Sequence, residues 1–126
     1  MSAPSTVLVV EDDDAIRDVL EAALADEGYA VRAVRQGQAA LEALRDSPPD
    51  VVLLDLMLPV LDGWGFLEER VRLGLALDTR VIVLSASRRA AALERERLAV
   101  WAVVAKPFEL DDLLTTVGRA VAQRAV

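Results

Sequence analysis

The sequence predicts an α/β fold: a parallel five-stranded sheet with helices on both faces. Short apolar runs alternate five times with segments whose apolar residues recur at helical spacing, which is the pattern of repeated strand–helix units. Two of the runs, residues 51–54 and 81–84, are apolar at every position, as is typical of strands covered on both faces. The chain has 126 residues, 54% of them hydrophobic and 28% charged. We therefore expect one globular domain over residues 1–126.

The first half of the chain predicts two strand–helix pairs. Residues 6–10, TVLVV, form a β-branched run that suits a buried strand. The next apolar positions lie on one face of a helix, at spacings of three, four, seven and eight: Ile16, Val19, Leu20, Ala23 and Leu24. Asp13 or Asp14 is placed to cap this helix, and Gly28 follows its end. Residues 30–34 predict a second strand, and residues 39–44 a second helix.

The second half predicts three further strands and their helices. After a Ser-Pro-Pro-Asp turn at residues 47–50, the third strand covers residues 51–54. A helical stripe follows at Phe66, Leu67, Arg70 and Val71. Residues 81–84 predict the fourth strand, residues 87–98 a charged helix with a thin apolar face, and residues 101–105 the fifth strand. Leucines and valines from residue 110 to residue 121 predict the last helix.

Composition and charge exclude several classes of function. The net charge of −7 makes nucleic acid and anionic membranes poor direct partners, whereas a metal cation or a basic protein face is more compatible. The chain has no cysteine and no histidine, which excludes disulfides, thiolate chemistry, histidine-ligated zinc and a phosphohistidine of its own. The first residues carry no basic leader, and no apolar run approaches 18 residues. We expect a cytoplasmic protein without a membrane partner.

The segment VVLLDLMLP, residues 51–59, contains one carboxylate, Asp55, in the most hydrophobic part of the chain. A buried carboxylate is costly unless something pairs with it. In a parallel sheet, the carboxyl ends of the strands share one edge, where ligands bind. The other strands bring Glu11 and Asp12, Ser85, and Lys106 to that edge. We expect these side chains to gather around Asp55.

This set of residues predicts a magnesium and phosphoryl site. Carboxylates a few ångströms apart repel by up to about 4 kcal/mol per pair at an effective dielectric of 20. Lys106 offsets only part of that repulsion, and Mg²⁺, which prefers oxygen ligands, offsets the rest. Asp55 is the acid on the central strand, so we assign it as the nucleophile that accepts phosphate. Lys106 and the Ser85 hydroxyl are expected to bind phosphoryl oxygens.

The expected metal ligands are the carboxylates of Asp12 and Asp55, with Glu11 close by, directly or through water. The backbone carbonyl of Met57, two residues after Asp55, is expected to complete the shell. Acidic clusters also cap helices, and this is the role that we assign to Asp13 or Asp14.

Four segments at the strand ends resemble the receiver domain of bacterial two-component response regulators. They are VLVVEDD at 7–13, LLDLMLPVLDG at 53–63, VIVLSAS at 81–87 and AKPFELDDLL at 105–114. The resemblance covers essentially the whole chain. It implies a flavodoxin-like (βα)5 sheet of order 2-1-3-4-5 and Mg²⁺-dependent phosphoryl transfer to Asp55 from a sensor histidine kinase or phosphotransfer protein. It also implies a switch hydroxyl at Ser85 and a cis bond before Pro107.

The chain departs from the family pattern at one switch position. The family usually has Tyr or Phe three residues before the lysine, where this chain has Val103. An aromatic switch at that site is therefore absent. Trp101 shares the strand parity of Val103, which is compatible with both lying on one face, and a substitute gate at Trp101 is the less favoured alternative. The resemblance implies a downstream protein target on the surface made by residues 87–98, 101–105 and the last helix. If the chain is complete, we expect a single-domain regulator, and if it is a piece of a longer protein, the effector domain lies outside it.

Two other functions are compatible with an acidic edge. One is a pseudo-receiver, an interaction module that no longer takes phosphate, and the absence of the aromatic residue at Val103 favours it. The other is a phosphatase of the haloacid-dehalogenase type, which also uses an aspartyl nucleophile. That enzyme usually needs a second acid two residues further on, where this chain has Met57. We therefore expect a switch and not an enzyme.

Overall fold

The computed structural model describes residues 3–58, 61–86 and 95–124. Its elements, in chain order, are β1 (Thr6–Val10), α1 (Asp14–Asp26), β2 (Ala30–Val34), α2 (Gly37–Asp46), β3 (Val51–Asp55), α3 (Gly63–Leu73), β4 (Arg80–Ser85), β5 (Ala102–Ala105) and α4 (Leu110–Arg124). Most of the helix expected at residues 87–98 lies outside the described residues, and residues 95–99 form turns. No helix in the described parts of the chain combines the length and apolar character needed to cross a bilayer.

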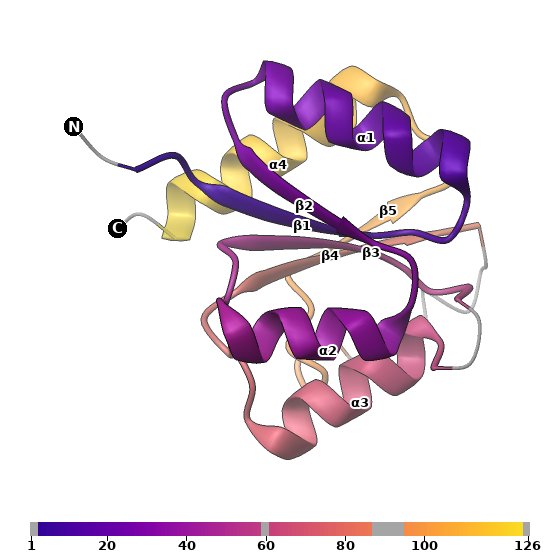
Figure 1. The fold of residues 1–126 in the computed structure, drawn as a ribbon, viewed down its shortest axis with the longest axis vertical. Coiled ribbons are helices and arrows are strands. Elements are labelled where there is room, and N and C mark those ends of the chain that lie inside the picture. The colour runs from indigo at the N-terminus through magenta and orange to yellow at the C-terminus, as the bar shows by residue number, and fades with distance from the viewer. Residues whose placement is uncertain (1–2, 59–60, 87–94, 125–126) are drawn as a thin grey trace.

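The five strands form one parallel sheet in the order β2-β1-β3-β4-β5. Helices α1 and α4 cover one face, and α2 and α3 cover the other (Figure 1). Every residue of the central strand β3 is buried, because both of its faces pack against helices. The fold class and strand order expected from the sequence are therefore confirmed.

Polar caps fix where α1 and α3 begin. The Asp13 side chain accepts a hydrogen bond from the backbone N–H of Ile16, so Asp13 and not Asp14 is the N-cap of α1. Asp62 caps α3 in the same way, through the N–H of Gly65. Gly74 ends α3 with a φ of 65°, a left-handed conformation that glycine adopts without strain. The cap at Asp13 thus starts α1 at Asp14, directly after the acidic residues that follow β1.

The loop after β3 lies tightly against its neighbours. A Cβ atom at Gly63 would be 2.5 Å from the Cα of Leu56, and one at Gly37 would be 2.4 Å from the carbonyl oxygen of Leu61. Only glycine allows these approaches. The first residues of α2 and α3 therefore hold both ends of the segment that leaves Asp55.

The expected common face of Trp101 and Val103 is wrong. Val103 packs against the core beneath α2 and α3, whereas Trp101 packs with the core beneath α1 and α4. Trp101 precedes β5, so the strict alternation of a strand does not extend to it. Its indole N–H instead donates to the side-chain oxygen of Gln123 on α4, at 3.0 Å. Trp101 cannot replace the missing aromatic residue at Val103.

Candidate functional site

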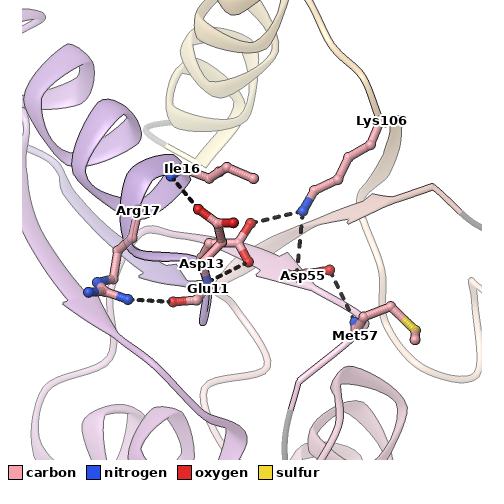
Figure 2. Close-up of polar contacts among 7 residues, drawn as sticks. All are labelled: Glu11, Asp13, Ile16, Arg17, Asp55, Met57 and Lys106. Atoms are coloured by element: carbon pink, nitrogen blue, oxygen red, sulfur yellow. Dashed lines mark hydrogen bonds and ion pairs between the residues drawn. The ribbon is translucent and has the colours of Figure 1, made fainter.

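The carboxyl ends of β1, β3 and β5 bring together the charged residues that the sequence predicted. Carboxylate oxygens of Glu11, Asp12 and Asp55 lie within 4.8 Å of one another. Glu11 is 1% exposed and Asp55 is 5% exposed, whereas Asp12 lies at the surface. Lys106 approaches from the loop after β5 (Figure 2). The site is therefore an acidic pocket, with two buried carboxylates and one at its mouth.

Lys106 pairs with both buried acids. Its Nζ lies 2.8 Å from Oε1 of Glu11 and 3.5 Å from Oδ2 of Asp55. Within the described residues it is the one cation that contacts either carboxylate. Three acids facing one lysine leave a formal charge of −2 when all are ionised. The pocket therefore carries a deficit of positive charge.

The electrostatics of Glu11 reflect this deficit. Burial, followed by the neighbouring Asp55 carboxyl, raises the pKa of Glu11 to about 7, although Lys106 opposes the shift. Burial acts to lower the pKa of Lys106, but its hydrogen bond with Glu11 and the charge of Asp55 outweigh burial and raise it. Without another cation, the pocket therefore reduces its repulsion by keeping a proton on Glu11 near neutral pH.

The Asp55 carboxylate is oriented from two directions. Its Oδ1 accepts a hydrogen bond from the backbone N–H of Met57 at 3.1 Å, and its Oδ2 faces Lys106 (Figure 2). The Met57 side chain is 71% exposed beside it. Met57 contacts Asp55 through its N–H, and the expected metal contact of its carbonyl stays a prediction.

Ser85 lies at the end of β4, next to the pocket. It is buried, and its carbonyl oxygen accepts the backbone N–H of Lys106 at 2.9 Å. This bond joins the strand end that carries the hydroxyl to the residue that carries the ammonium. The peptide bond between Lys106 and Pro107 is cis, as the family resemblance implied. The expected contact of the Ser85 hydroxyl with phosphate stays a prediction.

The acidic loop after β1 is fixed by two hydrogen bonds to the main chain of Glu11. The N–H of Glu11 donates to the carbonyl of Val34 at the end of β2, at 3.1 Å. The carbonyl of Glu11 accepts from Nη1 of Arg17, also at 3.1 Å (Figure 2). Sequence reasoning missed Arg17, because its position on α1 gave no sign that it would turn back to a main-chain oxygen.

A second feature that sequence reasoning missed is an apolar groove beside the pocket. It has a volume of about 230 Å³ and is lined by Ala15, Ile16, Val19, Leu20 and Phe108. Val19 was expected in the helical core stripe, but it is 55% exposed. The stripe on α1 is wider than the sheet face it covers, so its edge is left facing solvent next to Phe108.

The donor set fits a hard divalent cation. Three carboxylates supply oxygen ligands, which Mg²⁺ prefers. Two of them are buried beside a single lysine, so a cation would remove a repulsion that the protein alone does not cancel. Asp12 and Asp55 would hold it, with Glu11 as a direct or water-bridged neighbour.

Comparisons with known proteins agree with this geometry. The family described as "Response regulator receiver domain" matches residues 7–118. The chain is 36% identical over 124 residues to the regulatory protein AtoC of Escherichia coli, covering 96% of this chain and 26% of AtoC. It is 35% identical over 123 residues to the response regulator MprA of Mycolicibacterium vanbaalenii, covering 96% of this chain and 52% of MprA.

The fold also matches solved structures. The chemotaxis response regulator CheY4 of Vibrio cholerae superposes with a TM-score of 0.84 at 26% identity, over 94% of this chain and 99% of that one. The chain spans between 26% and 52% of the length of the two curated relatives named above. The strand order, the acidic pocket and these matches lead to one conclusion: the chain belongs to the family of response regulator receiver domains.

Proposed function

We propose that this chain is a phosphorylation-dependent signalling switch of the cytoplasm, which accepts a phosphoryl group on Asp55 with Mg²⁺ and changes a partner-binding surface. The observation that carries the proposal is the acidic pocket: three carboxylates within 4.8 Å of one another, faced by one lysine, at the carboxyl edge of the sheet. Its residues lie within the part of the chain that the receiver family matches.

Mg²⁺ would be held by the carboxylates of Asp12 and Asp55, by the Met57 carbonyl and, directly or through water, by Glu11. When bound, it supplies positive charge that balances both the acids and the incoming phosphoryl oxygens. Lys106 is already positioned between Glu11 and Asp55 to bind a further phosphoryl oxygen.

The transfer step needs a nucleophile that is ionised and held in place. The Asp55 carboxylate is oriented by the Met57 N–H and by Lys106. One of its oxygens forms a bond to the phosphorus of a phosphohistidine on a sensor kinase or phosphotransfer protein. The phosphorus–nitrogen bond breaks, and the imidazole leaves with its electron pair. The chain has no histidine, so the donor is a second protein or a small phosphodonor.

The donor protein would dock beside the pocket. The groove formed by Ile16, Val19 and Phe108 offers exposed apolar surface where α1 meets the loop after β5. An apolar helix face on the partner would cover it and bring its phosphohistidine to Asp55. The net charge of −7 favours a partner with basic residues and disfavours nucleic acid or an anionic membrane.

The switch itself would pass through β4 and β5. Phosphate on Asp55 draws the Ser85 hydroxyl and Lys106 toward its oxygens, and the main chain of these two residues is joined by a hydrogen bond. The surface made by β5 and α4 then changes, and a downstream protein reads it. To reverse a 1:99 population ratio, phosphorylation must favour the active form by about 5.5 kcal/mol.

The proposal is tested with a small phosphodonor such as acetyl phosphate. We expect intact-mass spectrometry to show one phosphate per wild-type chain with Mg²⁺ and none with a chelator. Asp55→Asn should take no phosphate, whereas the control Asp46→Asn, an exposed acid on α2, should behave as wild type. Incorporation that persists in Asp55→Asn would refute the assignment.

Val103 favours a second candidate, a pseudo-receiver that binds its partner without phosphate. It is a half-buried valine packed on the α2 and α3 core, at the position where the family usually has an aromatic switch. If this candidate is right, a partner captured by the wild-type chain should bind Asp55→Asn equally well. A phosphatase is disfavoured, because Met57 presents a backbone N–H to Asp55 where that class needs a second acid.

A further inference from the structure

We propose that Arg17 is a positioning residue, which sets the direction of Asp12 by holding the peptide group that joins Glu11 to Asp12. The inference rests on the proposed function, because Asp12 matters only if the pocket binds a cation. Arg17 itself touches no carboxylate of the pocket. Its Nη1 donates to the main-chain oxygen of Glu11 at 3.1 Å.

The hydrogen bond from Arg17 acts on the peptide group between Glu11 and Asp12. The oxygen that Arg17 holds belongs to the peptide group whose nitrogen is that of Asp12. The preceding N–H of Glu11 is bonded to Val34 of β2. Both main-chain polar groups of Glu11 are therefore held, one by the sheet and one by Arg17. Since a peptide group is planar, fixing its oxygen fixes the starting direction of the Asp12 backbone.

The Asp12 side chain has fewer contacts than the other two carboxylates of the pocket. Glu11 and Asp55 are buried and paired with Lys106. Asp12 is exposed, and in the described parts of the chain its side chain has no hydrogen bond or ion pair. Its carboxylate nevertheless belongs to the group within 4.8 Å. The backbone alone directs it there, so the contact that holds this backbone controls the third ligand.

Arg17 is well placed to hold this peptide group. Its side chain is only 15% exposed, although it lies on the first turns of a surface helix. Its second nitrogen is paired with Asp14, which Arg35 of the β2 end also approaches at 3.7 Å. Arg17 and Lys106 approach Glu11 from opposite sides (Figure 2). Arg17 thus acts on the main chain of the acidic loop, and Lys106 on its side chain.

The test compares Mg²⁺ binding in four chains by isothermal titration calorimetry. Arg17→Met removes the donor and keeps the aliphatic stem, and we expect about ten-fold weaker binding, as for the loss of an outer-shell contact. Arg17→Lys keeps the positive charge and one donor nitrogen in place of two, and should recover part of the Mg²⁺ affinity. The matched control is Arg72→Met, which removes the same kind of ion pair, to Glu69 three residues earlier on α3, without a carbonyl contact. It should bind as wild type.

A second readout separates positioning from folding. In Arg17→Met, the amide resonance of Asp12 should shift, while the far-ultraviolet circular dichroism stays that of wild type. Saturating Mg²⁺ should restore phosphate uptake from acetyl phosphate, because Asp55 is intact. Should Arg17→Met not fold, Asp14→Asn replaces it: it leaves Arg17 without its anchoring acid and should weaken Mg²⁺ binding by a smaller factor.

The outcomes distinguish the two proposals. If Arg17→Met or its substitute binds Mg²⁺ as tightly as wild type, the role of Arg17 is overturned, and the proposed function stands. If Arg17→Lys recovers part of the affinity that Arg17→Met loses, a donor at this position supports Mg²⁺ binding, and the proposal is supported. If the wild-type chain binds no Mg²⁺, both proposals fail together.

Discussion

The two edges of the sheet each bury charge, but they neutralise it in different ways. At the carboxyl edge, Glu11 and Asp55 share one lysine. At the amino edge, Arg70 of α3 is 0% exposed. Its guanidinium donates to four main-chain oxygens, those of Ala76, Thr79, Leu98 and Ala99, at 3.1 to 3.4 Å. These acceptors lie just before β4 and β5, at the opposite end of the strands from the acidic pocket.

The difference shows which edge is built to change. Burial lowers the pKa of Arg70, yet an arginine stays protonated, and four fixed dipoles face its charge. Ala76 and Ala99 adopt left-handed conformations, with φ of 48° and 53°, and both direct their carbonyls to Arg70. These four hydrogen bonds form without a ligand, and in the described structure the buried Nε of Arg70 has no hydrogen-bond partner. The carboxyl edge has like charges that only an added cation or proton relieves, so it can respond to a ligand.

The largest expected effect comes from removing the Arg70 guanidinium at the amino edge of the sheet. Arg70→Ala leaves four carbonyls, two of them on buried residues, without their donor and creates a cavity, so we expect it to destabilise the fold by about 3 kcal/mol or more. Urea unfolding measures this loss. The exposed Arg72→Ala on the same helix is the control and should change stability little. A loss no greater than that of the control would show that the carbonyl cluster does not need its cation.

The second prediction concerns how the acidic pocket at the carboxyl edge makes the free energy of unfolding depend on pH. The pKa of Glu11 is raised from its ordinary 4.5 to about 7, so between these values the folded chain binds more protons than the unfolded chain. The stability contributed at low pH is therefore lost as the pH rises through this window, by up to about 3 kcal/mol. Glu11→Gln should remove this part of the slope. An unchanged slope in that variant would contradict the raised pKa.

Removing the ammonium group of Lys106 from the carboxyl edge should have a smaller effect on stability. Lys106→Met leaves two buried carboxyls unpaired, which we expect to cost about 2 kcal/mol at pH 7.5. The loss should shrink at pH 5.5, because Glu11 then takes a proton, and also in Mg²⁺. Thermal unfolding at the two pH values, with and without Mg²⁺, checks this. A loss of stability that is the same under all four conditions would mean that Lys106 contributes through side-chain packing and not through its charge.

The smallest effects separate two adjacent acids. Asp13→Ala removes the N-cap of α1 and should cost about 1 kcal/mol of stability, with little change in Mg²⁺ affinity. Asp12→Asn should do the reverse, because it removes repulsion in the pocket and one metal ligand. Its melting temperature without Mg²⁺ should rise slightly, and its Mg²⁺ binding should fall. If both variants lose stability and keep Mg²⁺ binding, Asp12 is a structural acid.

The two edges also differ in how far the sequence predicted them. The carboxyl edge was predictable because its charges interrupt or directly follow apolar runs, as Asp55 and Lys106 do. Helical spacing placed Arg70 on the buried stripe of α3, and it is buried. Its partners could not be predicted, because main-chain carbonyls carry no signature in side-chain chemistry. The contact of Arg17 with the Glu11 carbonyl was missed for the same reason.

Where side-chain periodicity was the only guide, the prediction failed for Trp101 and Val19. The face of Trp101 was wrong because the strand begins one residue later, at Ala102. Val19 fits the helical stripe and is nevertheless half exposed, because spacing gives the direction of a side chain and not the width of the surface that covers it. Both errors lie next to surfaces that a partner would contact.

The most direct test of cation binding in the acidic pocket is a calorimetric titration of the wild-type chain with Mg²⁺ at pH 7. It is carried out in buffers of different ionisation enthalpy. We predict one Mg²⁺ per chain and the release of about half a proton, because the pKa of Glu11 is about 7 before the cation binds. Glu11→Gln should release none. Binding that is absent, or that is unchanged in Asp12→Asn, would contradict the account.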